Sequence, residues 1–447
     1  MINRKENIVK VLKFGGSSLS DSEQFEKVKN IVKSDSDRSV VVVSAPGRRN
    51  EDDSKITDLL YLCHAHVKYD VPYDSILEMI KERYVEICKG CGLKTDIAGI
   101  ISETFAGINK KTNLDFIASR GEYFNAILMA EYLGYKFIDA KDWLVFDYNG
   151  EVNYEISEKN FKEIYDVHGK IVTPGFYGAL PNGEVKVFSR GGSDVTGAIA
   201  AAALDASVYE NWTDVSGILM VDPRIVDNPK TIARVTYDEL RELSYMGAAV
   251  LHEDTVFAVR NKDIPVNIRN TNEPENPGTI IRENFNEISE EEKDRFITGI
   301  AGKKDFSIIN IYKNSLGEAK IGLLREVLEL FDKFDVPIEQ IPSGVDSFSI
   351  VVPSESIENK KYEIMAALRE NPSIDKCEIT EGISLIAIVG RQMAFRIGIS
   401  SMIFKALGDN KINVRTIEQG ADEINIMVGV FTKDFDRAIQ ILYKSFS

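Results

Sequence analysis

The chain has 447 residues, of which 28% are charged and 44% hydrophobic, the balance of a globular protein long enough for two or three cores. With 70 acidic residues against 54 basic ones, its formal charge of −16 disfavours nonspecific binding to nucleic acids or anionic membranes, because both need a positive field. No apolar run reaches the roughly 20 residues that cross a bilayer and no signal-peptide core is present, so we expect a cytoplasmic protein without a membrane partner.

The four cysteines, Cys63, Cys88, Cys91 and Cys377, are too few and too scattered for a disulfide framework. The Cys88 and Cys91 spacing resembles half of a zinc or redox site, and residues 63–66 (Cys-His-Ala-His) resemble a partial metal cluster. No further ligand-rich segment accompanies either one. We therefore expect packing roles for both and no metal site.

The first predicted element is an apolar strand at residues 8–12 that leads into KFGGSS, residues 13–18. Two adjacent glycines followed by two hydroxyl residues predict a sharp turn with exposed backbone N–H groups, which is a place to hold phosphate. Lys13 ends the strand as a mobile charge, and Gly15 and Gly16 let the main chain approach an anion. The alternative is a Gly-Gly turn with a solvated lysine. The order differs from the Walker motif, in which lysine follows the glycines.

Helical spacing at residues 25–32 and a buried strand at residues 39–44 complete a β-α-β start. The carboxyl end of this second strand, at Ser44, is expected at the same sheet edge as KFGGSS, the usual ligand edge of an open α/β sheet. Residues 48–111 carry mainly helical patterns and predict a helical insertion. Within it Thr57 lies near a helix start, where its hydroxyl could cap the helix or contact a ligand.

Two further motifs place charged side chains beside helix starts. SRGE, residues 119–122, opens a helix, and Glu122 there either complements the helix dipole or pairs with a substrate ammonium; spacing alone does not choose. A later strand leads into SRGGSD, residues 189–194, and then into an alanine-rich helix. Arg190 and Asp194 flank two glycines, which exceeds what a turn requires and predicts an anion-binding nest with a second charge to position a cation.

A strand at residues 208–215 ends in a polar pair, and the turn at residues 222–224 (Asp-Pro-Arg) offers an arginine to a phosphate. Two helices, at about 237–246 and 252–261, and a further strand follow. A loop with two prolines and an acidic stretch then indicate a domain boundary near residue 295.

Beyond residue 295 the pattern changes to strand, helix, two strands and helix, and this order occurs twice. Two similar α+β units of about 70 residues suggest a duplicated small domain, at about 300–380 and 384–447, with interleaving of the two as an alternative. Each unit has a sheet to complete, so we expect the paired units to share one, within a chain or between chains.

The motifs KFGGSS, SRGE, TPGFYG, SRGGSD, WTDVSG and DPR, followed by the doubled tail, occur in one order from about Lys10 to the end of the chain. In this combination the sequence resembles the aspartokinase family of the amino acid kinase fold. The resemblance implies a three-layer α/β/α catalytic domain at 1–295 and a regulatory region at 296–447 with two ferredoxin-like ACT domains. It also implies MgATP-dependent phosphorylation of the β-carboxylate of L-aspartate to 4-phospho-L-aspartate, the first step towards lysine, methionine and threonine.

By this resemblance, Lys13 stabilises the transferred phosphoryl group, and Asp194 orients Lys13 or the magnesium shell. Arg190 with Gly191 holds the substrate α-carboxylate, and Glu122 holds the substrate ammonium. The aspartate pocket is further implied to include Ser44, Thr57 and Phe176. The implied nucleotide contacts are Lys13, Gly15, Gly16, Ser17, Thr213, Asp214, Leu219 and Arg224. A carboxylate nucleophile is already ionised at neutral pH, so we expect catalysis by alignment and charge neutralisation, without a general base.

Two positions depart from the family pattern. Leu219 stands where relatives commonly have a tyrosine, and Ala249 stands where they have a lysine. Both family positions contact nucleotide, so the purine contact and the ATP affinity are expected to differ in this chain.

For regulation, the resemblance places an amino-acid effector between the first strand and the helix of the first ACT unit. The implied contacts are Asn314, Ser315, Gly322, Glu339, Ser343, Asp346 and Ser347, with a solvated loop as the alternative for each. Lysine is the expected effector, because a chain with two ACT units and no room for a fused dehydrogenase often belongs to that type. ACT pairing implies a homodimer or a homotetramer.

Two rival functions stay open. One is a kinase of the same fold for another acid, such as glutamate or N-acetylglutamate, or a carbamate kinase; WTDVSG and the ACT tail disfavour it. The other is a non-catalytic amino-acid sensor, which the presence of Lys13, Glu122, Arg190 and Asp194 disfavours.

Overall fold

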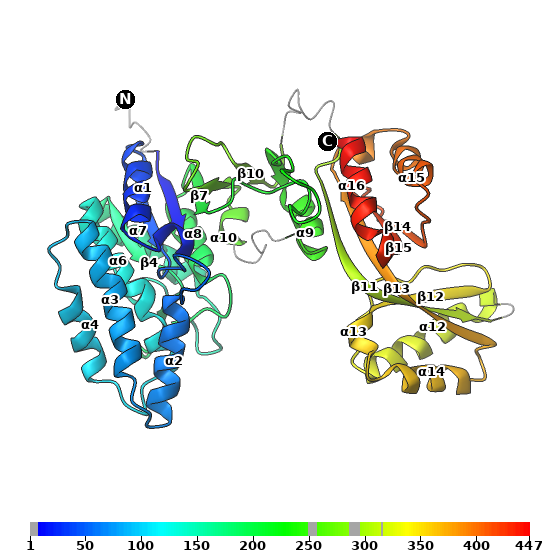
Figure 1. Cartoon of the computed structure of the whole chain (residues 1–447), viewed down its shortest axis with the longest axis horizontal. Coiled ribbons are helices and arrows are strands. Elements are labelled where there is room, and N and C mark those ends of the chain that lie inside the picture. Colours follow the sequence, from blue (N-terminus) through cyan, green and yellow to red (C-terminus); the bar gives the residue numbers. More distant parts are fainter. Residues whose placement is uncertain (1–7, 249–256, 286–295, 314–315) are drawn as a thin grey trace. The chain divides into compact units, whose positions relative to one another are not determined.

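The computed structural model describes residues 8–248, 257–285, 296–313 and 316–447. The chain forms two compact units (Figure 1). The first comprises Met1–Ile218, Ala233–Tyr237 and Leu251–Phe285, and the second comprises Leu219–Ile232, Asp238–Val250 and Asn286–Ser447. The domain boundary near residue 295 stays a prediction, and two segments that precede it belong to the second compact unit.

An eight-stranded sheet forms the centre of the first unit, with the strand order β3-β4-β2-β1-β7-β9-β10-β8. Neighbours from β3 to β9 run parallel, β10 is antiparallel to β9, and β8 is parallel to β10. β1 and β2 are buried almost throughout, as expected for parallel strands that are covered on both faces. The strands are β1 (Lys10–Phe14), β2 (Arg38–Val43), β3 (Lys136–Phe137), β4 (Ile171–Pro174), β7 (Val208–Thr213), β8 (Arg234–Thr236), β9 (Val266–Asn270) and β10 (Thr279–Arg282).

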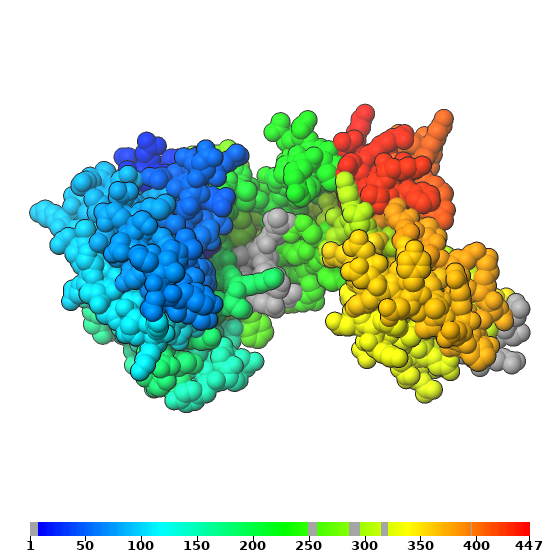
Figure 2. Space-filling view, turned by 60° about the horizontal axis from the view of Figure 1, so that its bottom comes forward, coloured from blue at the N-terminus to red at the C-terminus, as the bar shows by residue number. Residues whose placement is uncertain are grey.

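Alternate residues of the central strands face two different helical layers. Leu12 and Phe14 of β1 pack into an apolar core with the helices of the segment between β2 and β3 and with α1. Figure 2 shows part of this layer, in blue to cyan, at the surface of the first unit. Its helices are α1 (Ser22–Lys33), α2 (Ile56–Lys68), α3 (Asp74–Gly90), α4 (Ile97–Ala106), α5 (Leu114–Ala118) and α6 (Arg120–Leu133). Lys13, between Leu12 and Phe14, therefore points to the opposite face.

The opposite face is covered by α8 (Gly192–Ala203), which contacts β1, β2 and β7 and is flanked by α7 (Tyr154–His168) and α10 (Phe257–Arg260). α8 approaches β7 closely, because an ideal Cβ on Gly197 would lie 2.6 Å from the Tyr209 hydroxyl oxygen. A small hairpin of β5 (Tyr177–Ala179) and β6 (Val185–Val187) precedes α8. The predicted helix at 252–261 is described only from residue 257 onward.

The second unit contains a five-stranded antiparallel sheet with the order β12-β11-β13-β15-β14. Its central strands, β11 (Gly299–Tyr312) and β13 (Lys376–Val389), have 14 residues each and pair along their whole length. The end of β11 pairs with β12, and the end of β13 pairs with β15. The two α+β units thus share one sheet through interleaved strands.

Two apolar cores fill the second unit, one under each pair of helices. Figure 1 shows α12 and α14 along one half of the long strands and α15 and α16 along the other. Residues 338–341, where the sequence predicts a strand, form an isolated bridge from Gln340 to Val351. The remaining elements are α9 (Tyr237–Tyr245), α12 (Leu316–Lys333), β12 (Ser347–Pro353), α13 (Ser354–Ile357), α14 (Lys361–Glu370), α15 (Ile399–Asp409), β14 (Thr416–Gln419), β15 (Asn425–Phe431) and α16 (Phe435–Phe446). None of the helices in the described ranges combines the length and the apolar character that a bilayer span requires.

Candidate active site

The glycine turn after β1 lies against the chain that leaves β2. The Gly15 N–H donates to the Trp212 carbonyl at 3.0 Å, and the Gly47 N–H donates to the Gly16 carbonyl at 2.8 Å. An ideal Cβ on Gly47 would lie 2.7 Å from the carbonyl carbon of Gly16, so no larger residue fits without moving backbone. Within the described ranges, the N–H groups of Gly16 and Ser17 donate to no other group. The turn therefore presents two free donors at the carboxyl edge of the sheet, which is the arrangement that binds an anion.

Lys13 lies at this edge as a buried cation. It is 8% exposed, and its Nζ lies 2.7 Å from Asp194 Oδ1 in the first turn of α8. An ideal Cβ on Gly15 would lie 3.7 Å from that Nζ, so glycine leaves the space in front of the ammonium open. The predicted convergence of KFGGSS with SRGGSD is thus present as a direct ion pair.

Asn211 of β7 belongs to the same cluster and is a residue that the motif search missed. Its Nδ2 donates to Asp194 Oδ1 at 2.7 Å, and its Oδ1 lies 3.5 Å from Lys13 Nζ. The signal that could have found it is a polar amide at an inward position of a buried strand.

Glu122 lies in the first turn of α6, beside the chain that leaves β2. Its side chain is 5% exposed, and the N–H of Ala45 hydrogen-bonds to its carboxylate. Burial raises the pKa of Glu122 to about 8, against the opposing effects of the Ala45 and Glu122 N–H groups and of the Arg120 charge. Its Oε2 is buried without a partner in the described structure. An orphaned carboxylate oxygen in such a place fits a cationic ligand.

Local packing fixes the helix start that carries Glu122. An ideal Cβ on Gly121 would lie 2.8 Å from the Ala45 Cβ, and the Tyr84 hydroxyl donates to the Gly121 carbonyl at 2.6 Å. The Asn125 amide donates to the Ser44 carbonyl at 2.7 Å. These contacts hold α6 against the same short segment, residues 44–47, that contacts the glycine turn.

Thr57 and Ser44 are both half-buried at this segment. The N–H of Ile56, the residue before Thr57, donates to the Pro46 carbonyl at 3.3 Å, and the Ser44 N–H donates to the Phe14 carbonyl at 3.2 Å. The start of α2, the end of β2 and the end of β1 thus meet around residues 44–47.

TPGFYG and SRGGSD also pack on each other. The Gly175 N–H donates to the Val43 carbonyl at 2.9 Å, and an ideal Cβ on Gly192 would lie 2.8 Å from the Phe176 Cα. Phe176 has a φ of 78°, a strained value for a residue other than glycine. Arg190 is exposed and has no hydrogen bond or ion pair within the described ranges, and Gly191 beside it has a φ of 56°. An arginine in this position is available to an anion.

The predicted nucleotide residues fall into two groups. At the end of β7, the Thr213 hydroxyl donates to Asp214 Oδ1 at 3.1 Å, and Asp214 is exposed. Leu219 and Arg224 belong to the second compact unit, where the Arg224 guanidinium pairs with Asp222 at 2.6 Å. Their nucleotide contacts stay predictions. Ala249 lies outside the described residues.

Of the predicted effector residues, Asn314 and Ser315 lie outside the described residues, and Gly322 is exposed in α12. Glu339 accepts a hydrogen bond from the Tyr245 hydroxyl at 3.0 Å, while its Oε1 is buried without a partner in the described structure. The other predicted residues are Ser343 and Asp346, in the turn before β12, and Ser347, the first residue of β12. The Lys313 N–H donates to the Asp346 carbonyl at 3.0 Å, the Gly344 N–H donates to the Ser347 carbonyl at 2.8 Å, and Ser343 forms a bridge with Phe348.

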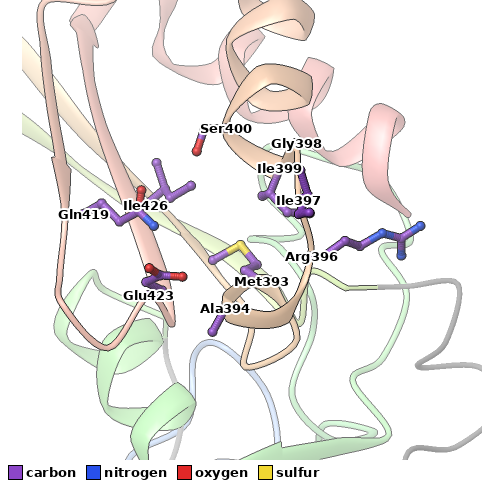
Figure 3. A pocket seen from close by; sticks show the side chains of 10 residues that line it. All are labelled: Met393, Ala394, Arg396, Ile397, Gly398, Ile399, Ser400, Gln419, Glu423 and Ile426. Carbon is purple, nitrogen blue, oxygen red and sulfur yellow. The ribbon is translucent and has the colours of Figure 1, made fainter.

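A pocket of about 300 Å³ lies in the second α+β unit, lined by the loop before α15, by the start of α15 and by β14, β15 and the turn between them (Figure 3). Figure 3 shows the Glu423 carboxylate at the pocket and the Arg396 side chain directed away from it. The sequence motifs did not single this pocket out. Its lining residues are Met393, Ala394, Arg396, Ile397, Gly398, Ile399, Ser400, Gln419, Glu423 and Ile426.

The cysteines have no partner that would suggest metal or redox chemistry in the described part of the chain. All four are free thiols. Burial raises the pKa of Cys63 to about 12, and burial is the main cause that raises the pKa of Cys91 to about 11. Among the described residues, no three His, Cys, Asp or Glu side chains are grouped to hold a metal ion.

Comparisons with known proteins match both the first part and the C-terminal part of the chain. The Amino acid kinase family model matches residues 9–270, and an ACT domain model matches residues 386–446. Aspartokinase 3 of Bacillus subtilis is 34% identical over 98% of each chain. A chloroplastic bifunctional aspartokinase/homoserine dehydrogenase of Arabidopsis thaliana is 28% identical over 98% of this chain, which spans 51% of that protein. The crystal structure of Clostridium acetobutylicum aspartate kinase is 47% identical, with a TM-score of 0.90 over 98% of this chain and 100% of the other. By sequence and by its α/β amino acid kinase fold with C-terminal ACT domains, the chain belongs to the aspartokinase family.

Proposed function

We propose that the chain transfers the γ-phosphoryl group of ATP to the β-carboxylate of L-aspartate and forms 4-phospho-L-aspartate. One observation carries this proposal: the glycine turn beside Lys13 and the orphaned carboxylate oxygen of Glu122 flank the same segment, residues 44–47. A site for an anionic phosphate chain thus adjoins a site for an ammonium group. Such a pair is suited to a nucleotide and an amino acid.

The residues after β1 fit a triphosphate. Gly16 and Ser17 offer free N–H donors, Gly15 keeps the space before Lys13 open, and the Lys13 ammonium neutralises charge that develops on the transferred group. Mg²⁺, when bound with the nucleotide, supplies further charge neutralisation. Because Mg²⁺ usually takes only one or two carboxylates in addition to phosphates, Asp194 is the side chain that fits this role.

The residues around Glu122 fit aspartate. The Glu122 carboxylate pairs with the substrate ammonium, and Arg190, with the N–H of Gly191, pairs with the α-carboxylate. Ser44, Thr57 and Phe176 line the space between them. The β-carboxylate, with an ordinary pKa near 4, is ionised at neutral pH and attacks without a base. The protein therefore contributes alignment and charge.

Thr213 and Asp214, at the end of β7, are proposed to contact the nucleoside end of ATP. The same role is proposed for Leu219 and Arg224. Leucine in place of tyrosine removes a hydroxyl and a ring, so a weaker purine contact is expected.

The test is the formation of an acyl hydroxamate from MgATP, hydroxylamine and one acid at a time: aspartate, glutamate or N-acetylglutamate. Aspartate alone should give product, and a Lys13→Met variant should give at least a thousandfold less. Product from glutamate or N-acetylglutamate but not from aspartate would contradict the proposal. Product from none of the acids would favour an amino-acid sensor.

We also propose feedback inhibition by lysine at the turn before β12. Glu339, which precedes this turn, supports the proposal because its buried Oε1 has no partner among the described residues and suits an ammonium. Lysine should inhibit the wild type. A Glu339→Gln variant should need at least tenfold more lysine for half-maximal inhibition, whereas a Glu363→Gln control, at an exposed position, should need the same amount as the wild type. Inhibition by threonine alone would contradict this assignment.

Assembly through the ACT domains into a homodimer or a homotetramer is proposed on the same family grounds. Sedimentation measurements with and without lysine would decide between these states, and a monomer at every concentration would contradict both. The cytoplasmic location stays a prediction from the sequence.

A further inference from the structure

The pairing of β1 with β7 places Asn211 opposite Lys13. The two strands run parallel and have Lys13 and Asn211 as register partners, so both side chains point to the face that α8 covers. On the other side of β7, the register partner of Asn211 is the apolar Ile268 of β9. Asn211 is 3% exposed. Its amide is therefore enclosed with Lys13 and with the first turn of α8.

α8 holds Asp194 in a fixed position beside Lys13 and Asn211. The Tyr209 hydroxyl, two residues before Asn211 on the same face, donates to the Asp194 carbonyl at 3.1 Å. The close approach of Gly197 to Tyr209 leaves no room for α8 to shift toward β7. The Asp194 side chain then meets two donors at one oxygen: Lys13 Nζ at 2.7 Å and Asn211 Nδ2 at 2.7 Å.

The Asn211 amide has one orientation that satisfies both neighbours. Its NH₂ group faces the carboxylate, and its carbonyl oxygen faces the ammonium, 3.5 Å away. The opposite orientation would set oxygen against carboxylate and NH₂ against ammonium. A neutral amide in this place holds an anion and a cation together without adding charge.

We propose that Asn211 is a positioning residue for phosphoryl transfer: its amide keeps the Asp194 carboxylate in place while the Lys13 ammonium serves the transferred phosphoryl group. This inference rests on the proposed function. The Lys13 ammonium must interact with two anions, the Asp194 carboxylate and the phosphate. The phosphate then weakens the ion pair between Lys13 and Asp194. Asn211 gives Asp194 a second donor that the phosphate cannot easily take, because that amide is enclosed by β1, β7, β9 and α8.

Two substitutions separate positioning from simple packing. Asn211→Leu removes the donor and keeps the number and branching of the side-chain heavy atoms. Asn211→Asp keeps the shape, removes the NH₂ donor and sets a second carboxylate against the Asp194 carboxylate. The control is Asn160→Leu. Asn160 is a half-buried residue of α7, outside the candidate active site, and this substitution removes its hydrogen bond to the Trp143 carbonyl.

The measurements are kcat and both KM values from pH 6 to 9, and the Kd of MgATP by titration calorimetry over the same range. For Asn211→Leu we expect kcat to fall about 10- to 100-fold at every pH, with the KM for aspartate unchanged within twofold. For Asn211→Asp we expect kcat and the MgATP affinity each to fall at least tenfold, because the Asp194 carboxylate then faces an acceptor in place of a donor. Asn160→Leu should match the wild type in all three constants.

The inference is overturned if Asn211→Leu retains kcat within threefold of the wild type, or if Asn211→Asp retains kcat and the MgATP affinity within threefold. Should the leucine variant fail to fold, the nearly isosteric aspartate variant carries the test. If the wild type forms no aspartyl hydroxamate, the proposed function fails, and the MgATP affinity of the Asn211→Asp variant still decides the role of Asn211.

Discussion

The clearest quantitative consequence of the structure concerns the protonation of Glu122. Without ligand, burial raises the pKa of Glu122 to about 8. At pH 7 only about a tenth of the molecules then carry the ionised carboxylate that we propose as the partner of the substrate ammonium. The apparent affinity for aspartate should be reduced by that fraction. We therefore predict that kcat/KM for aspartate rises about tenfold from pH 6 to pH 7 and levels off above pH 8.5.

Calorimetry offers a direct readout of the same event. Pairing with an ammonium stabilises the ionised form of Glu122, so binding of aspartate at pH 7 should release about 0.9 proton per site, and almost none at pH 9. The proton count comes from binding enthalpies in buffers of different ionisation heat. A pH-independent KM between pH 6 and 9, with no proton release at pH 7, would refute this reasoning.

Substitution of Glu122 by glutamine tests the stability side of this prediction. The folded-state pKa of Glu122 lies above its unfolded value of about 4.5, so the folded state binds the proton more tightly and stability falls as pH rises from about 4.5 to 8. A shift of this size corresponds to roughly 5 kcal/mol at most. Without aspartate, Glu122→Gln should therefore melt at a higher temperature than the wild type at pH 8.5 and at a similar one at pH 5. Its kcat/KM for aspartate should be about a hundredfold lower at pH 8.5.

Three further predictions concern other parts of the chain. Lys13→Met should lower kcat by at least about a thousandfold, measured by hydroxamate formation; a loss below tenfold would contradict its role. Gly47→Ala should cost about 1–3 kcal/mol and raise the KM for ATP, because its Cβ would meet backbone at 2.7 Å. Gly107→Ala, where a Cβ meets nothing within 4 Å, is the control, and equal stability of both variants would contradict the packing argument. Glu239→Gln should destabilise the second unit by about 3–5 kcal/mol in denaturant unfolding, because fully buried Glu239 pairs with Arg391 at 2.8 Å; an unchanged midpoint would show that this pair contributes little.

Much of the site follows from short local patterns. KFGGSS and SRGGSD could be predicted because adjacent glycines flanked by charged or hydroxyl side chains at a strand end exceed what a turn requires. Glu122 illustrates where such patterns stop. The sequence leaves its two roles open, whereas the orphaned oxygen and the raised pKa, which depend on burial by residues far away in the chain, favour a ligand.

Other features depend on contacts that no local pattern reveals. Asn211 is a single polar residue in a buried strand. Its proposed positioning role becomes visible only when β1 and α8 place Lys13 and Asp194 beside it. The full length of β11 is hidden in the sequence because Lys303, Lys304 and Asp305 interrupt its apolar pattern. The register of β11 shifts there, and Asp305 takes a φ of 69°, so the strand continues through the polar residues and joins both α+β units.

The central claim is that the β-carboxylate of aspartate becomes bonded to the γ-phosphorus of ATP. Aspartate labelled with ¹⁸O in that carboxylate tests it most directly, with MgATP and hydroxylamine present. Hydroxylamine attacks the carbonyl carbon of the acyl phosphate, so the released phosphate should carry one ¹⁸O atom, visible as an isotope shift in its ³¹P resonance. Unlabelled phosphate, released at the rate of hydroxamate formation, would contradict the account.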